Sequence, residues 1–184
     1  MAMQEPRTTG LVLADLFDFP DDGVKRELIG GVLYVSPSPR LRHQLVVARL
    51  TQYFMNHTDE HGGVVYPGAN VDPAVGDHVE PDVVALRAGY DGPMDDLSIL
   101  GPPDLLVEVS SPSTKRYDLM KKRPLYERHR VPELWLVDLD HDVVLEHRLR
   151  GDHTYGDPAI LGVGDELTAT VFPGLRIAVR DLLA

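Results

Sequence analysis

A chain of 184 residues, 43% of them hydrophobic and 26% charged, has the composition of a globular protein with a substantial core. It contains no cysteine, which excludes disulfides and thiolate metal sites and leaves carboxylates and imidazoles as the metal ligands. The formal net charge of −11 argues against nucleic-acid binding led by nonspecific backbone contacts. No apolar run approaches the roughly 20 residues of a membrane span and no signal-peptide pattern opens the chain, so we expect a cytoplasmic protein.

The N-terminal part of the chain is predicted to hold a tail, a hairpin and a long helix. Residues 1–10 should form a flexible tail, followed by a short helix over 11–19 and a turn at 20–23. Two short strands flank Gly30-Gly31, a dipeptide that suits a tight hairpin because both positions can take positive φ. Apolar residues recur at helical spacing from 39 to 58, which predicts an amphipathic helix that ends by Gly62-Gly63.

The rest of the chain alternates strands with one basic helix. We expect strands at 64–66, 81–86 and 104–110, with a polar loop over 87–103, and then a helix over 115–130. A hairpin of strands at 134–140 and 143–149 follows, then a short strand near Tyr155 and an ordered segment at 175–183. This order predicts one α/β or α+β domain over 11–184, with a mixed sheet that carries helices on its faces.

The charges fall into two blocks along the chain. Residues 72–108 hold nine acidic residues and one basic residue, whereas residues 115–130 hold seven basic and two acidic ones. Such an arrangement suits a site that binds a cation and then a polyanion. The alternative is two solvated surfaces that attract each other.

Two acidic residues lie at strands that otherwise read as buried. Glu108 is inside DLLVEVSS and Asp82 is inside VEPDVVAL. A buried carboxylate must be paired or coordinate a cation, so Glu108 has either a structural partner or a metal. If the two strands are neighbours, both carboxylates converge, and oxygen ligands of this kind favour Mg²⁺ or Mn²⁺, the ions suited to phosphodiester hydrolysis.

The basic helix begins directly after the strand of Glu108. Asp118, Lys122 and Tyr126 are spaced four apart and should share one helix face, which would bring a cation to the acidic pair. Pro124 removes a backbone donor and biases Arg123 away from helical geometry, so the helix should kink or restart there. Lys121 and Lys115 are then alternatives to Lys122.

These segments together resemble a known family. The ordered blocks RELIGGVLYVSPSP, RHQLVVARL, VEPDVVAL, DLLVEVSSPST, D-x3-K-x3-Y, VPELWLVDLD and FPGLRIAVRDLL are similar to the Uma-two restriction endonuclease family of the PD-(D/E)XK nuclease superfamily. The resemblance runs from about Leu11 to the C-terminus. It implies a restriction-endonuclease-like fold, in which helices flank a mixed β-sheet core that carries an N-terminal β-hairpin.

The resemblance also implies roles for individual residues. Asp82 matches the Pro-Asp aspartate and Glu108 the acid of the E-x-K element, and both would hold the metal together with the backbone carbonyl of Val109. Ser110 stands where the wider superfamily has lysine, and Lys122 matches the helix lysine that supplies the charge instead. Further matches at Glu27 and His43 would close the site.

The resulting hypothesis is a Mg²⁺-dependent endonuclease that hydrolyses DNA phosphodiester bonds and works as a homodimer, although the sequence shows no dimer face. The alternative is a non-catalytic nucleic-acid-binding or regulatory protein that keeps the nuclease fold, which the acidic composition, Ser110 and Pro124 favour. Activity on RNA stays open, since no RNA-recognition motif is present.

Several motifs also have structural interpretations. HTDEH, residues 57–61, matches the H-x-x-E-H spelling of a zinc peptidase, but it ends where the helix must stop. Asp82 could instead pair with an arginine, and His43 could be a partly buried helix residue. Tyr126 and Trp135 are expected in the core, and Ser113 or Thr114 is expected to cap the basic helix.

Overall fold

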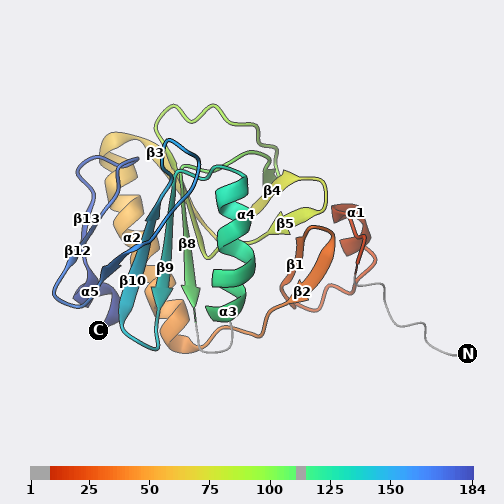
Figure 1. Cartoon of the computed structure of the whole chain (residues 1–184), viewed down its shortest axis with the longest axis horizontal. Helices are drawn as coiled ribbons and strands as arrows, with labels where there is room; N and C mark the ends of the chain where they lie inside the picture. The colour runs from red at the N-terminus through yellow and green to blue at the C-terminus, as the bar shows by residue number, and fades with distance from the viewer. Residues whose placement is uncertain (1–8, 111–114) are drawn as a thin grey trace, which may run out of the picture.

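The computed structural model describes residues 9–110 and 115–184. Most of the predicted tail, and the predicted capping residues Ser113 and Thr114, lie outside the described residues. Within them the chain forms a six-stranded sheet, a smaller five-stranded sheet and a two-stranded ribbon (Figure 1). No described helix combines the length and the apolar character that crossing a membrane requires.

The six-stranded sheet is the centre of the fold. Its strand order is β11-β10-β9-β8-β6-β3, and the strands are β3 (Gly63–Pro67), β6 (Val83–Arg87), β8 (Leu105–Ser110), β9 (Glu133–Asp138), β10 (Val143–Arg148) and β11 (Ala159–Leu161). β8 and β9 run parallel and the other neighbours run antiparallel, which confirms the mixed sheet. Every residue of β8 and β9 is buried, as expected of strands covered on both faces.

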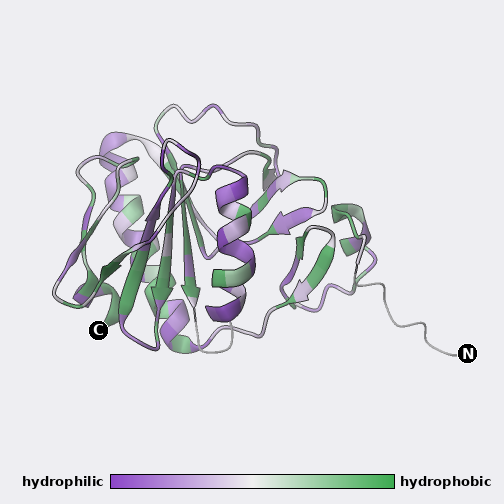
Figure 2. Cartoon of the chain, in the orientation of Figure 1, coloured by the Kyte–Doolittle hydropathy of each residue, from purple (hydrophilic) through white to green (hydrophobic). Residues whose placement is uncertain are grey.

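Helices cover both faces of this sheet (Figure 1). The long helix α2 (Leu41–His61) and the C-terminal α5 (Val179–Leu183) share a core with Leu105, Val107 and Val109 of β8. Leu106 points the other way, into the core that α4 (Arg123–Arg128) completes. Figure 2 shows the consequence, since the central strands are mainly hydrophobic while the helices carry both hydrophobic and hydrophilic residues.

The five-stranded sheet contains the predicted N-terminal hairpin. The hairpin turns at Gly30 and Gly31, whose φ values of 60° and 72° confirm the tight turn. The strand order is β2-β1-β5-β4-β7, with bounds β1 (Arg26–Ile29), β2 (Val32–Val35), β4 (Asn70–Ala74), β5 (Asp77–Val79) and β7 (Ser98–Ile99). The sequence does not predict the last three, because they are short and polar. A short helix, α1 (Leu13–Leu16), precedes the hairpin.

The basic helix departs from the prediction at Pro124. It consists of α3 (Lys115–Tyr117), a π-helical turn η1 (Asp118–Lys122) and α4. Arg123 keeps helical angles, φ −55° and ψ −49°, and its N–H bonds to the carbonyl of Asp118. The expected bias of Arg123 away from helical geometry is therefore wrong, because the wider turn accommodates the proline within a continuous helical segment.

The C-terminal region also differs from the prediction. Tyr155 lies outside any strand; it is buried, and its hydroxyl donates to the carbonyl of Val131. The strand expected there is β11, a few residues later. The final segment forms the ribbon strands β12 (Glu166–Thr168) and β13 (Arg176–Ala178), and then α5.

Candidate active site

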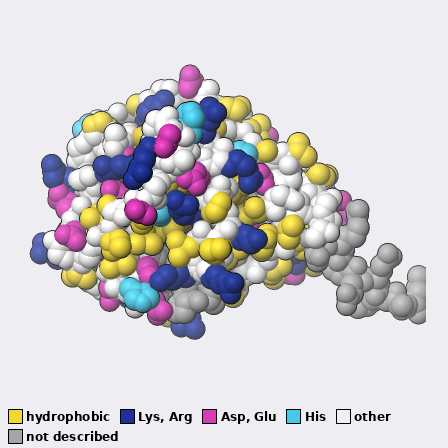
Figure 3. All heavy atoms as spheres, viewed as in Figure 1, with side chains coloured by type: hydrophobic (Ala, Val, Ile, Leu, Met, Phe, Trp, Pro, Cys, Tyr) yellow, Lys and Arg dark blue, Asp and Glu magenta, His cyan; other side chains and the backbone are white. Residues whose placement is uncertain are grey.

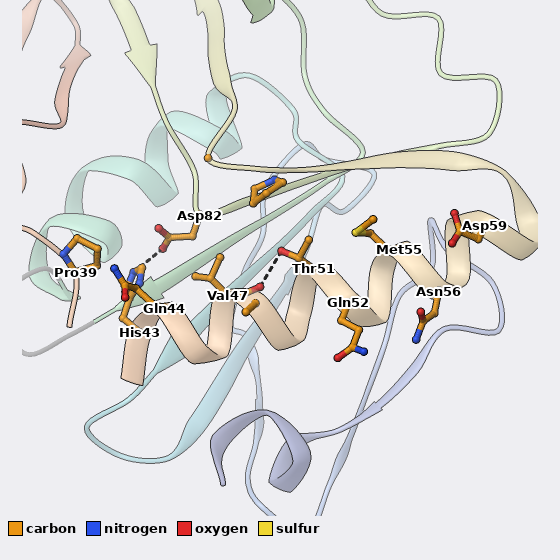
Figure 4. A pocket seen from close by; sticks show the side chains of 13 residues that line it. Pro39, His43, Gln44, Val47, Thr51, Gln52, Met55, Asn56, Asp59 and Asp82 are labelled. Atoms are coloured by element: carbon orange, nitrogen blue, oxygen red, sulfur yellow. Dashed lines mark hydrogen bonds and ion pairs between the residues drawn. The ribbon is translucent and has the colours of Figure 1, made fainter. Parts of the chain in front are cut away.

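The sheet brings Asp82 and Glu108 to the same place. β6 and β8 pair antiparallel with Val83 opposite Val107, so Asp82 lies across from Glu108. Asp82 Oδ2 accepts the backbone N–H of Val109 at 2.7 Å and lies 3.2 Å from Nε2 of His43 (Figure 4). The convergence of the two predicted carboxylates therefore follows from the strand register.

Glu108 faces away from α2 because it alternates with Val107 and Val109 along β8. Its side chain points toward α4, and Glu108 is only 2% exposed. Lys122 Nζ donates to its two oxygens at 2.9 and 3.0 Å, and the hydroxyl of Tyr126 donates to Oε1 at 2.5 Å. The buried charge thus has a structural partner, which is one of the two explanations expected from sequence.

Glu27 brings a third carboxylate from the hairpin. It is fully buried, and its Oε1 lies 2.9 Å from Nζ of Lys122 and accepts the backbone N–H of Glu80 at 2.9 Å. Its Oε2 accepts the hydroxyl of Tyr117 at 3.2 Å, and Lys25 lies 3.9 Å from Oε1. Lys122 therefore links two carboxylates that come from different sheets.

Ser110 has a defined place at the end of β8. Its hydroxyl donates to Asp118 Oδ2 at 2.6 Å, and both residues are buried. Asp118, Lys122 and Tyr126 all contact the end of β8, as their spacing predicts. Sequence analysis assigns Asp118 and Tyr126 no catalytic role, and it misses Lys25 and Tyr117, whose neighbours are distant along the chain.

The structure separates the three candidate lysines. Of these three, all within the described part of the chain, only Lys122 touches the carboxylates of the site. Lys115 pairs with Asp138 at 2.6 Å, and Lys121 lies 6.0 Å from the centre of the Tyr34 ring. Lys122 is therefore the lysine that the fold places beside Glu108.

Burial and neighbouring charges shift the pKa values of the carboxylates in this site. Burial raises the pKa of Glu108 to about 8, although Lys122 opposes the rise, and burial also raises the pKa of Asp118. Burial likewise opposes ionisation of Glu27, but Lys122 and Lys25 outweigh it and lower the pKa of Glu27. Glu27 is therefore the more strongly ionised of the two carboxylates that contact Lys122.

Two further pKa shifts favour the charged forms of Asp82 and Lys122 at the cavity. Burial opposes ionisation of Asp82, but the hydrogen bond and charge of His43, together with Lys25 and Lys122, outweigh burial and lower the pKa of Asp82. Burial also opposes the charge of Lys122, but Glu108, Glu27 and Asp118 outweigh it and raise the pKa of Lys122 well above its ordinary value. Lys122 therefore stays positively charged over the whole range of pH in which the protein would function.

A cavity of about 390 Å³ opens onto this cluster. Its lining includes Asp82, Glu108, Asp118, Lys25, Lys122 and His43. The lining also includes Glu80 and Arg40, and Glu27 lies behind it, so five carboxyl groups meet two lysines and one arginine. Carboxylate oxygens are the donors that a hard divalent cation prefers, and Asp82 and Glu108 are the two that could hold one. The described residues provide no group of three or more acidic or histidine side chains arranged for a metal, so the remaining ligands would be backbone, water or substrate.

The competing peptidase motif forms a different structure. His57 and His61 lie on the last turn of α2, where their rings stack with centroids 4.4 Å apart. His61 Nδ1 lies 3.1 Å from the carbonyl of His57, within the helix itself. The position of the two histidines at the C-terminal end of α2 therefore explains them without a metal.

The two charge blocks contact each other in the fold. Arg128 of the basic block pairs with Asp77 of the acidic block at 2.7 Å, and Lys122 pairs with Glu108. Figure 3 shows basic and acidic side chains interspersed on the face that carries α4. The blocks therefore attract each other, but they do so through buried carboxylates and not as two solvated surfaces. Tyr126 and Trp135 are buried, as predicted.

Comparison with known proteins identifies the family. The crystal structure of "a putative nuclease belonging to DUF820 from Anabaena variabilis ATCC 29413" matches with a TM-score of 0.77 and 16% identity, covering 94% of this chain and 97% of that chain. This likeness shows the same fold. No curated protein matches the chain. The model of the Uma2 family, described as "Putative restriction endonuclease", matches residues 13–180. The chain therefore belongs to the Uma2 family.

Proposed function

We propose that this protein is a metal-dependent endonuclease that hydrolyses DNA phosphodiester bonds, with residues 11–184 as its one catalytic domain. The observation that carries the proposal is the meeting of Asp82 and Glu108 at one cavity with Lys122 against them. The description of the family as a restriction endonuclease and that of the Anabaena protein as a nuclease support the same reaction class.

Each residue of the site has a role in this proposal. Asp82 and Glu108, with the carbonyl of Val109, would hold Mg²⁺ or Mn²⁺, the type of ion used by restriction-endonuclease-like families. When bound, such an ion lowers the pKa of water and offsets phosphate charge. Lys122 supplies a fixed positive charge beside the scissile phosphate, and Glu27 holds the lysine in position through its 2.9 Å contact.

His43 orients Asp82 at the edge of the cavity. In the tautomer with its proton on Nε2, His43 donates to Asp82. Its Nδ1 is then unprotonated, and it is buried without a hydrogen-bond partner among the described residues.

A non-catalytic nucleic-acid-binding protein is the second candidate. The observation that favours it is the contact of Lys122 with both oxygens of Glu108, which satisfies the carboxylate without a metal. In that case Glu108 is a structural residue. Replacing Glu108 would then reduce the free energy of unfolding, and divalent ions would have no effect on nucleic-acid binding.

Calorimetric titration of Mg²⁺ and Mn²⁺, with plasmid nicking on the same samples, separates the two candidates. Wild type, Asp82→Asn and Glu108→Gln are compared with Glu166→Gln, which changes an exposed carboxylate on β12. The nuclease proposal requires that the first two variants lose both ion binding and nicking while Glu166→Gln keeps both. Wild-type protein that binds neither ion and never nicks DNA would refute it.

A further inference from the structure

A groove of about 690 Å³ runs along α2 from the candidate active site (Figure 4). It shares Pro39, His43 and Asp82 with the catalytic cavity. The turn at Pro67 and Gly68 lines its other side. Most of its wall is one face of α2, formed by Gln44, Val47, Ala48, Thr51, Gln52, Met55, Asn56 and Asp59.

This face is suited to protein rather than to a phosphate backbone. Among the described residues, no lysine or arginine lines the groove. The arginines of α2 are engaged elsewhere: Arg42 binds Asp142 and the carbonyl of Leu139, and Arg49 binds the carbonyls of Leu182 and Ala184. The groups exposed in the groove are mostly apolar or amide side chains, with Met55 50% exposed. Such a surface resembles the core of a protein interface more than a site for a polyanion.

The order of residues on this face makes it complementary to itself. If a second copy of α2 lies antiparallel, with the symmetry axis between Thr51 and Gln52, the small Ala48 faces the long Met55 of the other copy. Under the same pairing Gln44 faces Asp59, an amide donor opposite a carboxylate. Positions 44, 48, 51 and 55 alternate spacings of four and three, as helices that pack along a seam require.

The charges at the two ends of the helix agree with an antiparallel arrangement. The last turns of α2 carry the exposed Asp59 and Glu60, whereas the exposed Arg40 and the partly exposed His43 lie at its start. Antiparallel packing would place each acidic end beside the basic end of the other copy, and parallel packing would place like charges together. Arg40 is exposed at the N-cap of α2.

We propose that this groove is the interface at which two copies of the chain associate through antiparallel α2 helices about a two-fold axis near Thr51 and Gln52. An isologous contact of this kind closes on itself and gives a dimer. The turn at Pro67 and Gly68 supplies a second wall, so each partner helix packs in a groove. The proposal is independent of nuclease activity, because it rests only on the shape and the pattern of this face.

The oligomeric state of the full chain tests the proposal. Sedimentation equilibrium of wild type is expected to give twice the 20.4 kDa of one chain. Ala48→Lys places a charge opposite Met55 in the dimer, and should weaken association about a hundredfold. Ala48 is an exposed helix position, so the variant should keep the circular dichroism of wild type. Val163→Lys, at a 52% exposed site that does not line the groove, is the matched control and should remain dimeric.

Cross-linking tests the location of the axis. The natural chain has no cysteine, so Gln52→Cys introduces a single thiol close to its own symmetry mate, and mild oxidation should yield a disulfide dimer. Ile160→Cys, 66% exposed on β11, should not cross-link.

Three outcomes would overturn the proposal. The first is wild type that stays monomeric at about 100 µM, a concentration at which even a weak interface associates. The second is a dimer that Ala48→Lys leaves intact, because its interface would lie elsewhere. The third is a monomeric protein in which bound DNA protects the thiol of Gln52→Cys from an alkylating reagent. That result would assign the groove to nucleic acid.

Discussion

Replacing Lys122 by methionine should destabilise the protein strongly at neutral pH. Lys122 is 3% exposed and its ammonium group contacts Glu108 at 2.9 and 3.0 Å and Glu27 at 2.9 Å. Methionine fills a similar volume without a charge, so the variant leaves buried carboxylates uncompensated. Removing one partner of a buried ion pair costs about 3–5 kcal/mol, and we expect a loss in that range at pH 8.

The stability lost in Lys122→Met should be larger at high pH than at low pH. In wild type the pKa of Glu27 is lowered, so its contribution to stability is present above its ordinary value of 4.5 and is lost as the pH falls. In Lys122→Met, burial without the lysine raises the pKa of Glu27, so the variant loses stability as the pH rises above 4.5. The first effect acts below pH 4.5, so the second alone makes the difference between the two proteins larger at pH 8 than at pH 5.

Urea unfolding at pH 5 and pH 8, followed by circular dichroism, measures this difference without any assay of activity. Lys121→Met is the matched control, because Lys121 is exposed and its ammonium group lies 6.0 Å from the centre of the Tyr34 ring. It should change the free energy of unfolding by less than about 0.5 kcal/mol. A free energy of unfolding for Lys122→Met that lies less than about 1 kcal/mol below that of wild type at pH 8 would refute this reasoning. A difference that is the same at pH 5 and pH 8 would also refute it.

Three further predictions test other parts of the structure. Because the pKa of Glu108 is raised from 4.5 to about 8, metal-free wild type should lose stability as the pH rises through that interval, and Glu108→Gln should flatten the profile obtained by urea unfolding. Tyr126→Phe removes the hydroxyl that donates to Glu108 and should cost about 1.5–3 kcal/mol in thermal or urea unfolding; an unchanged midpoint would contradict that hydrogen bond. Gly31→Ala adds a Cβ 3.1 Å from the carbonyl oxygen of Leu11 at a φ of 72°, whereas the same change at Gly30 meets open space at a φ of 60°. Both should cost about 1 kcal/mol for the positive φ, and melting temperatures should show the larger loss at Gly31.

The elements that sequence predicts correctly have a strong local signal. α2 shows helical periodicity over five turns, β8 and β9 are continuous apolar runs, and Gly30-Gly31 marks its hairpin. Asp82 and Glu108 stand out for the same reason, since a carboxylate is conspicuous in an apolar strand. Local signals therefore locate both the core strands and the two acids of the site.

The features that sequence misses depend on contacts between distant segments. β4 and β5 are short strands, and their Val71 and Val79 are buried only because the strands pair with each other within the sheet. Tyr117 and Glu27 are 90 positions apart in the chain, so no local pattern links them. A prediction that assumes a straight α-helix is wrong about Pro124, because the π turn before it changes the geometry that the proline meets.

The π-helical turn changes how the D-x3-K-x3-Y motif should be understood. In a regular α-helix each residue advances 100°, so Tyr126 would lie about 80° around the helix from Asp118. Residues of a π turn advance by less, roughly 80° each, which brings Asp118 and Tyr126 close to the same line along the helix. A straight helix would align the same two groups if they were seven positions apart along the chain instead of eight. Relatives with one residue fewer in this segment can therefore carry an equivalent site, and a motif search with fixed spacing would overlook them.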